Sequence, residues 1–319
     1  MKTCLIFNPA AGKCRRTPAL FKAITRRVAE SGLDVSVVKT RERGHATELA
    51  RAAVRDGCTR IIAVGGDGTL NEIAPALIGT RLALGIVPAG SGNGLATHLG
   101  LPRDPLKALG LALEPASGSV AIDVGTVNDV VFVNTTGFGL DAEIASRCNE
   151  ISRRSFLSYA RTTWARFFQR APMRVTIDSG ARRVSLETLL VTVSNSDQYG
   201  HHACIAPGAS VRDGLIDLVA VKPMGPLRAV QFAAQLMLGR LHTNPRTLRL
   251  RAREFTLERI APGFLHTDGE LHYAGSKLEV RVHPAALRIV TAPGTRDRFV
   301  LKRRIRQPGP ARPSLPRFR

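Results

Sequence analysis

Apolar runs alternate with helically spaced apolar positions over the first 120 residues. Four short apolar runs have the length and composition of buried strands, at residues 2–7, 35–38, 61–64 and 82–87. Between them apolar side chains recur every three or four residues, as in Leu20, Ile24 and Val28, and glycines end these segments. Regular alternation of strands and helices predicts a parallel sheet covered by helices.

The pattern changes near residue 120. Strand-like segments then follow one another closely, at residues 120–127, 130–135, 174–177, 187–194, 214–221, 247–250, 254–259 and 277–282. Because long crossover segments are mostly absent, we predict a second, β-rich domain with antiparallel strands.

Two helical segments interrupt the second half of the chain. Residues 155–170 mix aromatic and arginine side chains, a composition that suits a membrane interface. We favour a helix packed on the sheet with its arginines outward. In residues 227–241, the side chains of Leu236, Met237 and Leu238 would line an apolar channel or belong to the core.

The loops after the four N-terminal strands carry polar residues and glycines. These loops comprise residues 8–13, 40–45, 65–69 and 90–93. Ligands of open α/β sheets bind at the carboxyl ends of the strands, so we expect the four loops to converge on one edge. The GxGxG run alone would be a weak signal, since it lacks dinucleotide-binding spacing.

Residues 61–72, IIAVGGDGTLNE, carry the most specific pattern. A strand, a glycine turn and a helix present backbone N–H groups and a helix N-terminus to phosphate. A carboxylate such as Asp67 inside this turn repels phosphate unless a cation or a proton transfer is involved. The pattern therefore predicts phosphoryl transfer with Mg²⁺. The alternative is an ordinary turn in which Asp67 caps the helix.

Two later loops also carry carboxylates. Residues 266–270, HTDGE, have the form of a hairpin turn, which alone needs no function. Considered together with Asp67, Asp268 and Glu270 offer a carboxylate that accepts a proton from an alcohol. The loop 207–217 would hold a hard cation through oxygen ligands or form a plain turn.

Composition places the chain among globular proteins. Its 319 residues suffice for two domains, and no apolar run approaches the length of a membrane span. Five scattered cysteines indicate neither a zinc site nor a disulfide framework, and we expect a cytoplasmic location. The net charge of +21 is compatible with nucleic acid, an anionic membrane or a polyanionic substrate, and equally with a general basic bias and no partner.

Six segments form an ordered set of motifs, at residues 8–12, 65–72, 88–96, 137–143, 206–217 and 268–270. Together they resemble the diacylglycerol kinase catalytic-domain superfamily, in particular the soluble bacterial lipid kinases related to sphingosine and ceramide kinases. The resemblance implies an α/β fold with a three-layer, Rossmann-like N-terminal domain and an antiparallel β-rich C-terminal domain. It also implies that ATP binds in the cleft between the two domains.

We expect a nucleotide-binding domain over residues 1–120, which the resemblance completes with residues 287–303. A lipid-substrate domain is expected over residues 121–286. The composition of residues 307–319 adds a basic, disordered tail.

The resemblance also implies roles for individual residues. Asp67 matches the acid that works with the catalytic Mg²⁺, Glu270 the proposed general base, and Asp141 an acid that meets the lipid headgroup. A structural Mg²⁺ site is matched by Ser210, Asp213 and Leu215, the serine and leucine through their carbonyl oxygens. Nucleotide contacts are matched by Asn8, Thr40, Gly65, Gly66, Asp67, Gly68, Thr69, Leu70, Asn71, Ser91 and Asn93.

One position departs from the bacterial diacylglycerol kinase pattern. Typical members have the motif GTxND, whose final acid contributes to the metal network, and this chain has Gly94 there. The GSGN form of residues 90–93 resembles the sphingosine and ceramide kinases instead. The departure argues against diacylglycerol as the substrate and weakens the transfer of that metal network.

We therefore predict an ATP- and Mg²⁺-dependent kinase that phosphorylates a lipid hydroxyl, of diacylglycerol or sphingosine type, at the inner face of the membrane. The basic charge predicts peripheral association with anionic lipid, and no specific nucleic acid is expected. The sequence is also compatible with a homodimer. The alternatives are a soluble-substrate kinase similar to NAD kinases and a nucleotide-binding regulator without catalysis.

Overall fold

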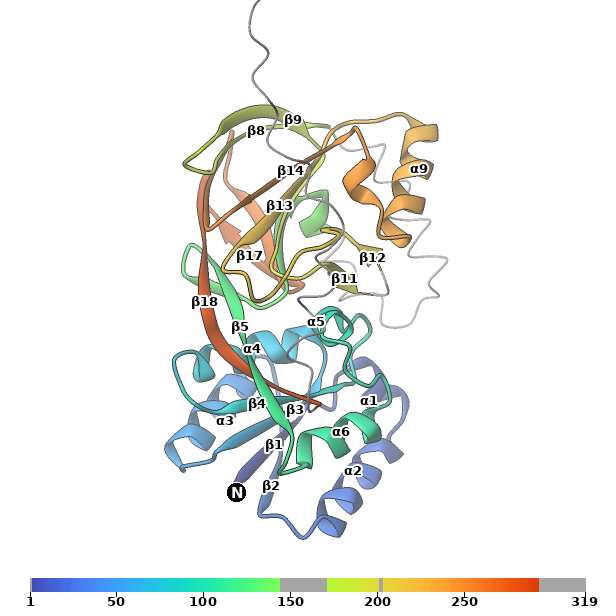
Figure 1. Ribbon diagram of the computed structural model, residues 1–319, viewed down its shortest axis with the longest axis vertical. Coiled ribbons are helices and arrows are strands. Elements are labelled where there is room, and N and C mark those ends of the chain that lie inside the picture. Colours follow the sequence, from blue (N-terminus) through green and yellow to red (C-terminus); the bar gives the residue numbers. More distant parts are fainter. Residues whose placement is uncertain (1, 144–170, 201–202, 293–319) are drawn as a thin grey trace, which may run out of the picture.

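The computed structural model describes residues 2–143, 171–200 and 203–292 (Figure 1). Its N-terminal strands are β1 (Thr3–Phe7), β2 (Val35–Lys39), β3 (Arg60–Gly65) and β4 (Ala83–Pro88). The helices between and after them are α1 (Gly12–Arg16), α2 (Ala19–Glu30), α3 (His45–Arg55), α4 (Asp67–Leu77), α5 (Gly94–His98) and α6 (Pro105–Leu113). The strands lie parallel in the order β2-β1-β3-β4, which confirms the predicted parallel sheet.

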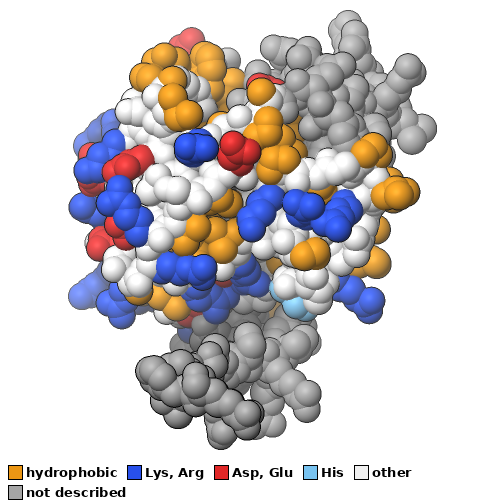
Figure 2. Space-filling view, turned by 90° about the horizontal axis from the view of Figure 1, so that it is seen from above, with side chains coloured by type: hydrophobic (Ala, Val, Ile, Leu, Met, Phe, Trp, Pro, Cys, Tyr) orange, Lys and Arg blue, Asp and Glu red, His pale blue; other side chains and the backbone are white. Residues whose placement is uncertain are grey.

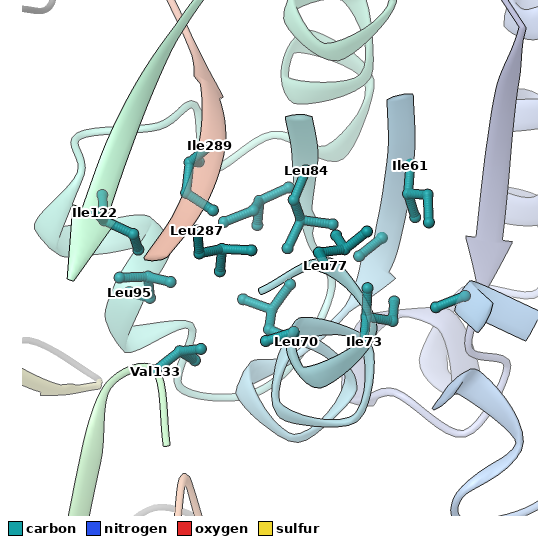
Figure 3. Close-up of a cluster of buried hydrophobic side chains, with 14 of the residues drawn as sticks. Ile61, Leu70, Ile73, Leu77, Leu84, Leu95, Ile122, Val133, Leu287 and Ile289 are labelled. Carbon is teal, nitrogen blue, oxygen red and sulfur yellow. The ribbon is translucent and has the colours of Figure 1, made fainter. Parts of the chain in front are cut away.

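Helices cover both faces of this sheet, so successive residues of β3 belong to different cores. Ile61 lies in the core that contains Leu70 of α4 (Figure 3). Its neighbour Ile62 lies in the core that contains Ile24 of α2 and Leu109 of α6. A strand buried on both faces needs an apolar side chain at every position, which explains the continuous apolar run. The predicted three-layer arrangement is confirmed.

The C-terminal part consists mainly of antiparallel strands, as predicted. Its first strands are β5 (Gly118–Val127), β6 (Val130–Phe132), β7 (Thr135–Gly139), β8 (Met173–Asp178), β9 (Arg183–Thr188), β10 (Leu190–Ser194), β11 (Gln198–Gly200) and β12 (Ala203–Cys204). The later elements are β13 (Ile216–Val221), α9 (Pro226–Met237), the 3₁₀-helix η1 (Leu241–Thr243), β14 (Thr247–Ala252), β15 (Glu254–Arg259), β16 (Gly263–Thr267), β17 (Glu270–Ala274) and β18 (Lys277–Thr291).

Two sheets enclose the C-terminal core. A six-stranded sheet has the order β14-β13-β10-β7-β16-β17. It packs against β8, β15 and β18 of a ten-stranded sheet, and Phe138, Val191 and Phe255 lie between the two layers. Truncating such a buried phenylalanine to alanine removes about 3 to 5 kcal/mol of stability.

The long strand β18 connects the two halves of the molecule (Figure 1). It pairs antiparallel with β15 and β5, and near its end Arg288 and Ile289 pair parallel with β4. Leu287 and Ile289 enter the core beneath α4 (Figure 3). The ten-stranded sheet therefore runs without interruption from the N-terminal to the C-terminal half, which fixes the two sides of the site.

Four predicted elements have different bounds in the structure. The strand predicted over residues 130–135 is wrong, because β6 ends at Phe132 in the ten-stranded sheet and β7 begins at Thr135 in the six-stranded sheet. The strand predicted over residues 187–194 is wrong, because the chain changes sheets at Leu189, between β9 and β10. Thr188 holds this crossing through a hydrogen bond to Val221 O at 2.8 Å. The helix predicted over residues 227–241 ends earlier, at Met237, and Gly239 follows in a left-handed conformation.

The strand predicted over residues 277–282 continues to Thr291. Its pairing with β5 shifts register between His283 and Leu287, where Pro284 lacks an N–H group and Ala285 has a positive φ of 52°. A proline normally ends a strand, but Pro284 lies where the pairing with β5 shifts register, so β18 continues through it.

Some predicted features lie outside the described residues. They are the aromatic and basic helix over residues 155–170, the basic tail over 307–319, and the end of the expected return segment from residue 293 onward. Among the helices that the structure describes, none is both long and apolar enough to cross a membrane.

Candidate active site

The turn between β3 and α4 is packed tightly against the loop that follows β4. A Cβ atom on Gly66 would lie 2.9 Å from Gly90 Cα. One on Gly65 would overlap the side chain of Thr69. In addition, Gly90 N donates to Gly65 O at 3.1 Å. Only glycine permits this backbone approach, so the two glycine-rich loops form one surface at the carboxyl edge of the sheet.

The loops after β1 and β2 lie beside this surface. Asn8 donates through Nδ2 to Thr69 Oγ1 at 2.9 Å, which ties the first loop to the start of α4. Thr40 is buried at the end of β2, where its N–H group donates to Phe7 O at 2.9 Å. Ser91 is exposed on the fourth loop. The structure therefore brings the four predicted loops together.

Asp67 begins α4, yet its carboxylate faces a different helix. Oδ2 accepts from Gly94 N at 3.0 Å and Oδ1 from Leu95 N at 3.4 Å, both in the first turn of α5. Gly66, not Asp67, caps α4, so the alternative in which Asp67 acts as the cap is wrong. Burial raises the pKa of Asp67, and the backbone N–H groups only partly oppose that shift. A half-buried carboxylate in this setting favours a cation beside it.

The loop before α5 explains the glycine that departs from the diacylglycerol kinase pattern. Asn93 has a left-handed φ of 52°, and its side chain exchanges two hydrogen bonds of 2.9 Å with the backbone of Gly90. A Cβ atom on Gly94 would lie 2.6 Å from Asn134 Nδ2 and 3.0 Å from Gln198 O. An acidic side chain at this position would have to displace the side chain of Asn134.

Glu270 reaches the same turn from the opposite half of the molecule. It begins β17, and a Cβ atom on Gly68 would lie 3.0 Å from Glu270 Oε1. Gly68 follows Asp67 directly, so the two predicted catalytic carboxylates approach the same turn. Arg43, from the loop after β2, forms an ion pair with Glu270 Oε2 at 2.6 Å.

Asp268 holds the β16–β17 hairpin in this position. The residue has a positive φ of 51°, and its buried carboxylate accepts from Val133 N, Asn134 N and Thr135 N at 2.7 to 2.9 Å. It also accepts from Asn71 Nδ2 of α4 at 2.9 Å. Burial raises the pKa of Asp268 to about 6 in spite of these donors. Asp268 therefore connects three segments and fixes the start of β17.

Several residues predicted to contact nucleotide also support the protein itself. Leu70 is buried in the core, and Thr69 fills the space beside Gly65. The amide nitrogen of Asn71 donates to Val131 O as well as to Asp268. These side chains shape the turn, and its backbone groups remain the natural partners for a phosphate.

Asp141 belongs to a buried polar network in the six-stranded sheet. Its Oδ2 accepts from Thr192 Oγ1 at 2.6 Å and lies 3.2 Å from His266 Nε2. Thr192 is also hydrogen-bonded to the hydroxyl of Tyr199. A neutral His266 carries its proton on Nε2, facing Asp141, because its Nδ1 accepts from Gly269 N at 3.3 Å.

The loop predicted to hold a structural cation is stabilised within the protein. Asp213 Oδ1 accepts from Leu215 N at 3.1 Å, and its Oδ2 lies 3.9 Å from Arg251 Nη1. Ser210 accepts from Arg212 N through its hydroxyl. Within the described part of the chain, no three His, Cys, Asp or Glu side chains gather as metal ligands. A cation at either predicted site would therefore need carbonyl, phosphate or water oxygens besides one carboxylate.

Thr192 and Asn134 contribute to these contacts but carried no signal in the sequence, because neither their residue type nor their spacing marks them. Arg43 lay in the predicted loop 40–45, but nothing in the sequence indicated that it pairs with Glu270. His266 lay within the HTDGE segment, but its neighbour Asp141 is 125 positions earlier, so nothing local joined them.

Comparison with known proteins gives the chain a family. Residues 2–127 match the family described as diacylglycerol kinase catalytic domain. Residues 134–291 match the family described as YegS C-terminal NAD kinase beta sandwich-like domain. A protein of Chromohalobacter salexigens named "Probable lipid kinase YegS-like" is 37% identical over 72% of this chain and 74% of its own length. The chain belongs to the YegS and diacylglycerol kinase family of lipid kinases.

Other relatives of this lipid kinase agree. The Bacillus subtilis protein named "Diacylglycerol kinase" is 28% identical over 74% of this chain and 78% of its own length. A crystal structure of a Bacillus anthracis diacylglycerol kinase has a TM-score of 0.68 and 20% identity, and covers 92% of this chain and 98% of that one. An Archaeoglobus fulgidus NAD kinase in complex with ATP has a TM-score of 0.51 and 13% identity, over 95% and 98% of the two chains. These structures show that the fold is shared.

Proposed function

We propose that this lipid kinase transfers the γ-phosphoryl group of ATP, with Mg²⁺, to a hydroxyl group of a lipid. The observation that carries the proposal is the approach of Glu270 to the turn that contains Asp67. Phosphoryl transfer to an alcohol needs a site for the phosphates and a nearby carboxylate that accepts the hydroxyl proton. The N-terminal half supplies the turn for the phosphates, and the C-terminal half supplies the carboxylate of Glu270.

The glycine-rich surface supports phosphate binding. The backbones of Gly66 and Gly90 approach without side chains, and the first turn of α4 presents N–H groups and the positive end of the helix dipole. Polyphosphate of ATP would lie along this surface, with Asn8 and Thr40 at its margin. The backbone N–H groups of Gly94 and Leu95 already donate to the carboxylate of Asp67, so they do not contribute to phosphate binding.

The residues present fit a magnesium ion. Mg²⁺ in nucleotide sites is held by one or two carboxylates, by phosphate oxygens and by water, and Asp67 supplies a half-buried carboxylate beside the phosphate surface. When bound, the ion would supply positive charge to the phosphoryl oxygens. Ser210, Asp213 and Leu215 remain the proposed second, structural site, for which Asp213 supplies the carboxylate.

Glu270 would accept the proton of the lipid hydroxyl. Arg43 holds one carboxylate oxygen, which leaves the other, Oε1, facing the α4 turn. Asp141 and its partner Thr192 would receive a polar headgroup. We favour a lipid of sphingosine or ceramide type over diacylglycerol, because residues 90–93 have the GSGN form of those kinases and Gly94 stands where the diacylglycerol kinase pattern has an acid.

The test is ATP turnover by the purified protein in mixed micelles that carry diacylglycerol, monoacylglycerol, sphingosine, ceramide or phosphatidylglycerol. Asp67→Asn and Glu270→Gln are compared with Asp34→Asn and Glu48→Gln, which make the same changes at exposed positions. We expect a phosphorylated lipid from the wild type and both controls, and losses of about 100-fold or more in both site variants.

Each result of this assay has a defined consequence. Phosphorylation that survives in Glu270→Gln would remove Glu270 as the proton acceptor. Transfer to NAD and not to any lipid would favour the soluble-substrate alternative. Nucleotide binding without any transfer would favour a regulator.

A further inference from the structure

Helix α9 turns a largely apolar face away from the protein. The side chains of Leu227, Val230, Met237 and Leu238 are 88%, 56%, 49% and 68% exposed. Ala233 and Ala234 between them are exposed too. These positions recur every three or four residues, so they form one stripe along the helix, with the exposed polar side chains of Arg228 and Gln231 at its edge.

The opposite face of α9 anchors the helix to the sandwich. Ala229 and Phe232 are buried, and Leu236 packs into the cluster of Leu140, Val219 and Leu241. The helix therefore packs on the domain through this opposite face, and packing does not require the exposed stripe to be apolar. An apolar patch that a folded protein leaves in water usually marks a surface with a partner.

The charge around α9 indicates the chemistry of that partner. Residues 218–253 contain seven Lys and Arg and no Asp or Glu, and two of the seven, Arg249 and Arg251, form ion pairs with Asp217. Arg228 and Arg240, at the two ends of the helix, are exposed. Figure 2 looks onto the end of the molecule that carries α9, and hydrophobic and basic side chains lie side by side on the right of this view. Apolar and basic groups together fit a surface of anionic lipid.

We infer that α9 is the element through which this kinase rests on an anionic membrane, with its Leu227–Leu238 stripe among the acyl chains and its arginines at the phosphate level. Twelve residues are too few to span a bilayer, so the helix lies in the plane of the interface. The inference deepens the proposed function, because a lipid substrate must be taken from such a surface.

The inner face of α9 leads towards the proposed headgroup site. Tyr199 packs against the same cluster as Leu236, and its hydroxyl is hydrogen-bonded to Thr192, the partner of Asp141. The membrane-facing helix and the wall of the headgroup site are thus parts of one packed unit.

A second copy of the chain fits this face less well than a membrane does. Two α9 helices paired antiparallel about a two-fold axis would bring the arginine at one end of the first helix close to the arginine at the other end of the second. Residues 218–253 contain no acidic side chain that could compensate these charges. Like charges at such an interface are unfavourable.

The experiment is flotation of the full-length protein with vesicles, without ATP. Vesicles of phosphatidylcholine alone are compared with vesicles that also contain phosphatidylglycerol. The test variant is Leu227→Glu with Leu238→Glu, and the control is Ala29→Glu with Leu106→Glu, which places the same charges on exposed positions of α2 and α6. Circular dichroism and thermal melting check that both variants fold.

We expect the wild type and the control to float with the anionic vesicles, and the α9 variant to lose binding about tenfold or more. Turnover of a lipid in vesicles falls with it, while turnover of the same lipid dispersed in detergent is kept. Binding that is equal in the α9 variant and the control would overturn the inference. So would sedimentation showing a wild-type dimer that the α9 variant dissociates while vesicle binding persists.

Failure of the proposed function would be seen separately. A protein that floats through α9 but phosphorylates no lipid would uphold this inference and reject the kinase proposal. A protein that phosphorylates detergent-dispersed lipid but binds vesicles independently of α9 would uphold the kinase proposal and reject the inference on α9.

Discussion

Arg43 Nη2 lies 2.6 Å from Glu270 Oε2, although the two residues are more than 220 positions apart in the chain. Arg43 follows β2 in the N-terminal half and Glu270 begins β17 in the C-terminal half. The pair is well exposed on the arginine side, so it adds little to stability. Its effect is geometric, because it holds one oxygen of the carboxylate and directs the other towards the α4 turn.

Replacement of Arg43 by glutamine is expected to lower kcat about tenfold, because Glu270 loses its fixed orientation. The KM for ATP and the unfolding free energy should change little. Steady-state kinetics with the lipid substrate, beside an Arg41→Gln control on the same loop, provide the measurement. Equal losses in the two variants would show that the loop's charge matters and not the ion pair.

Asp268 is expected to make stability depend on pH in a defined window. Its pKa is raised from 3.8 to about 6 in the folded protein, so between these values the folded state holds a proton that the unfolded state has released. The stability due to this group is therefore full below about pH 4 and is lost as the pH rises through about 6. By pH 7 the loss amounts to about 3 kcal/mol.

Urea unfolding of the wild type and of Asp268→Asn across this pH range tests the expectation. The difference in unfolding free energy between them should fall as the pH rises, since other groups titrate alike in both proteins. The matched control is Asp34→Asn, which makes the same change at an exposed position. A flat difference for Asp268→Asn itself would contradict the raised pKa.

Gly94→Asp, which restores the acid of the diacylglycerol kinase pattern, is expected to destabilise the protein. The new Cβ would lie 2.6 Å from Asn134 Nδ2, and relief of that clash costs about 1 to 3 kcal/mol. Thermal melting measures the effect. Adding Asn134→Ala should recover part of the loss, and a Gly94→Asp variant as stable as the wild type would show that the loop adapts freely.

Thr192→Val is expected to affect the lipid and not the nucleotide. The change keeps the shape of the side chain but removes the donor to Asp141, which leaves a buried carboxylate with fewer partners. We expect about 1 to 3 kcal/mol of destabilisation and a KM for lipid raised about tenfold, with the KM for ATP unchanged. A rise in both KM values would indicate a general disturbance of the fold.

The sequence by itself determined the architecture of the N-terminal half and the loop that carries Asp67. Strand runs buried on both faces, helical spacing and glycine turns are local patterns, so they can be read without knowledge of the fold. The same locality explains the errors. The chain crosses between sheets at Leu189 inside one apolar run, and β18 continues past Pro284 because β5 and β4 pair with it.

Only the tertiary structure decided which distant side chains meet. The ion pair of Arg43 with Glu270, the carboxylate of Asp268 under three backbone N–H groups, and the crowding at Gly94 all depend on contacts between separate elements. The two apolar sides of α9 are alike in sequence, and packing alone determines that Phe232 is buried and Leu227 exposed. Hydrophobic patterning fixes the type of an element, whereas its neighbours fix what each side chain touches.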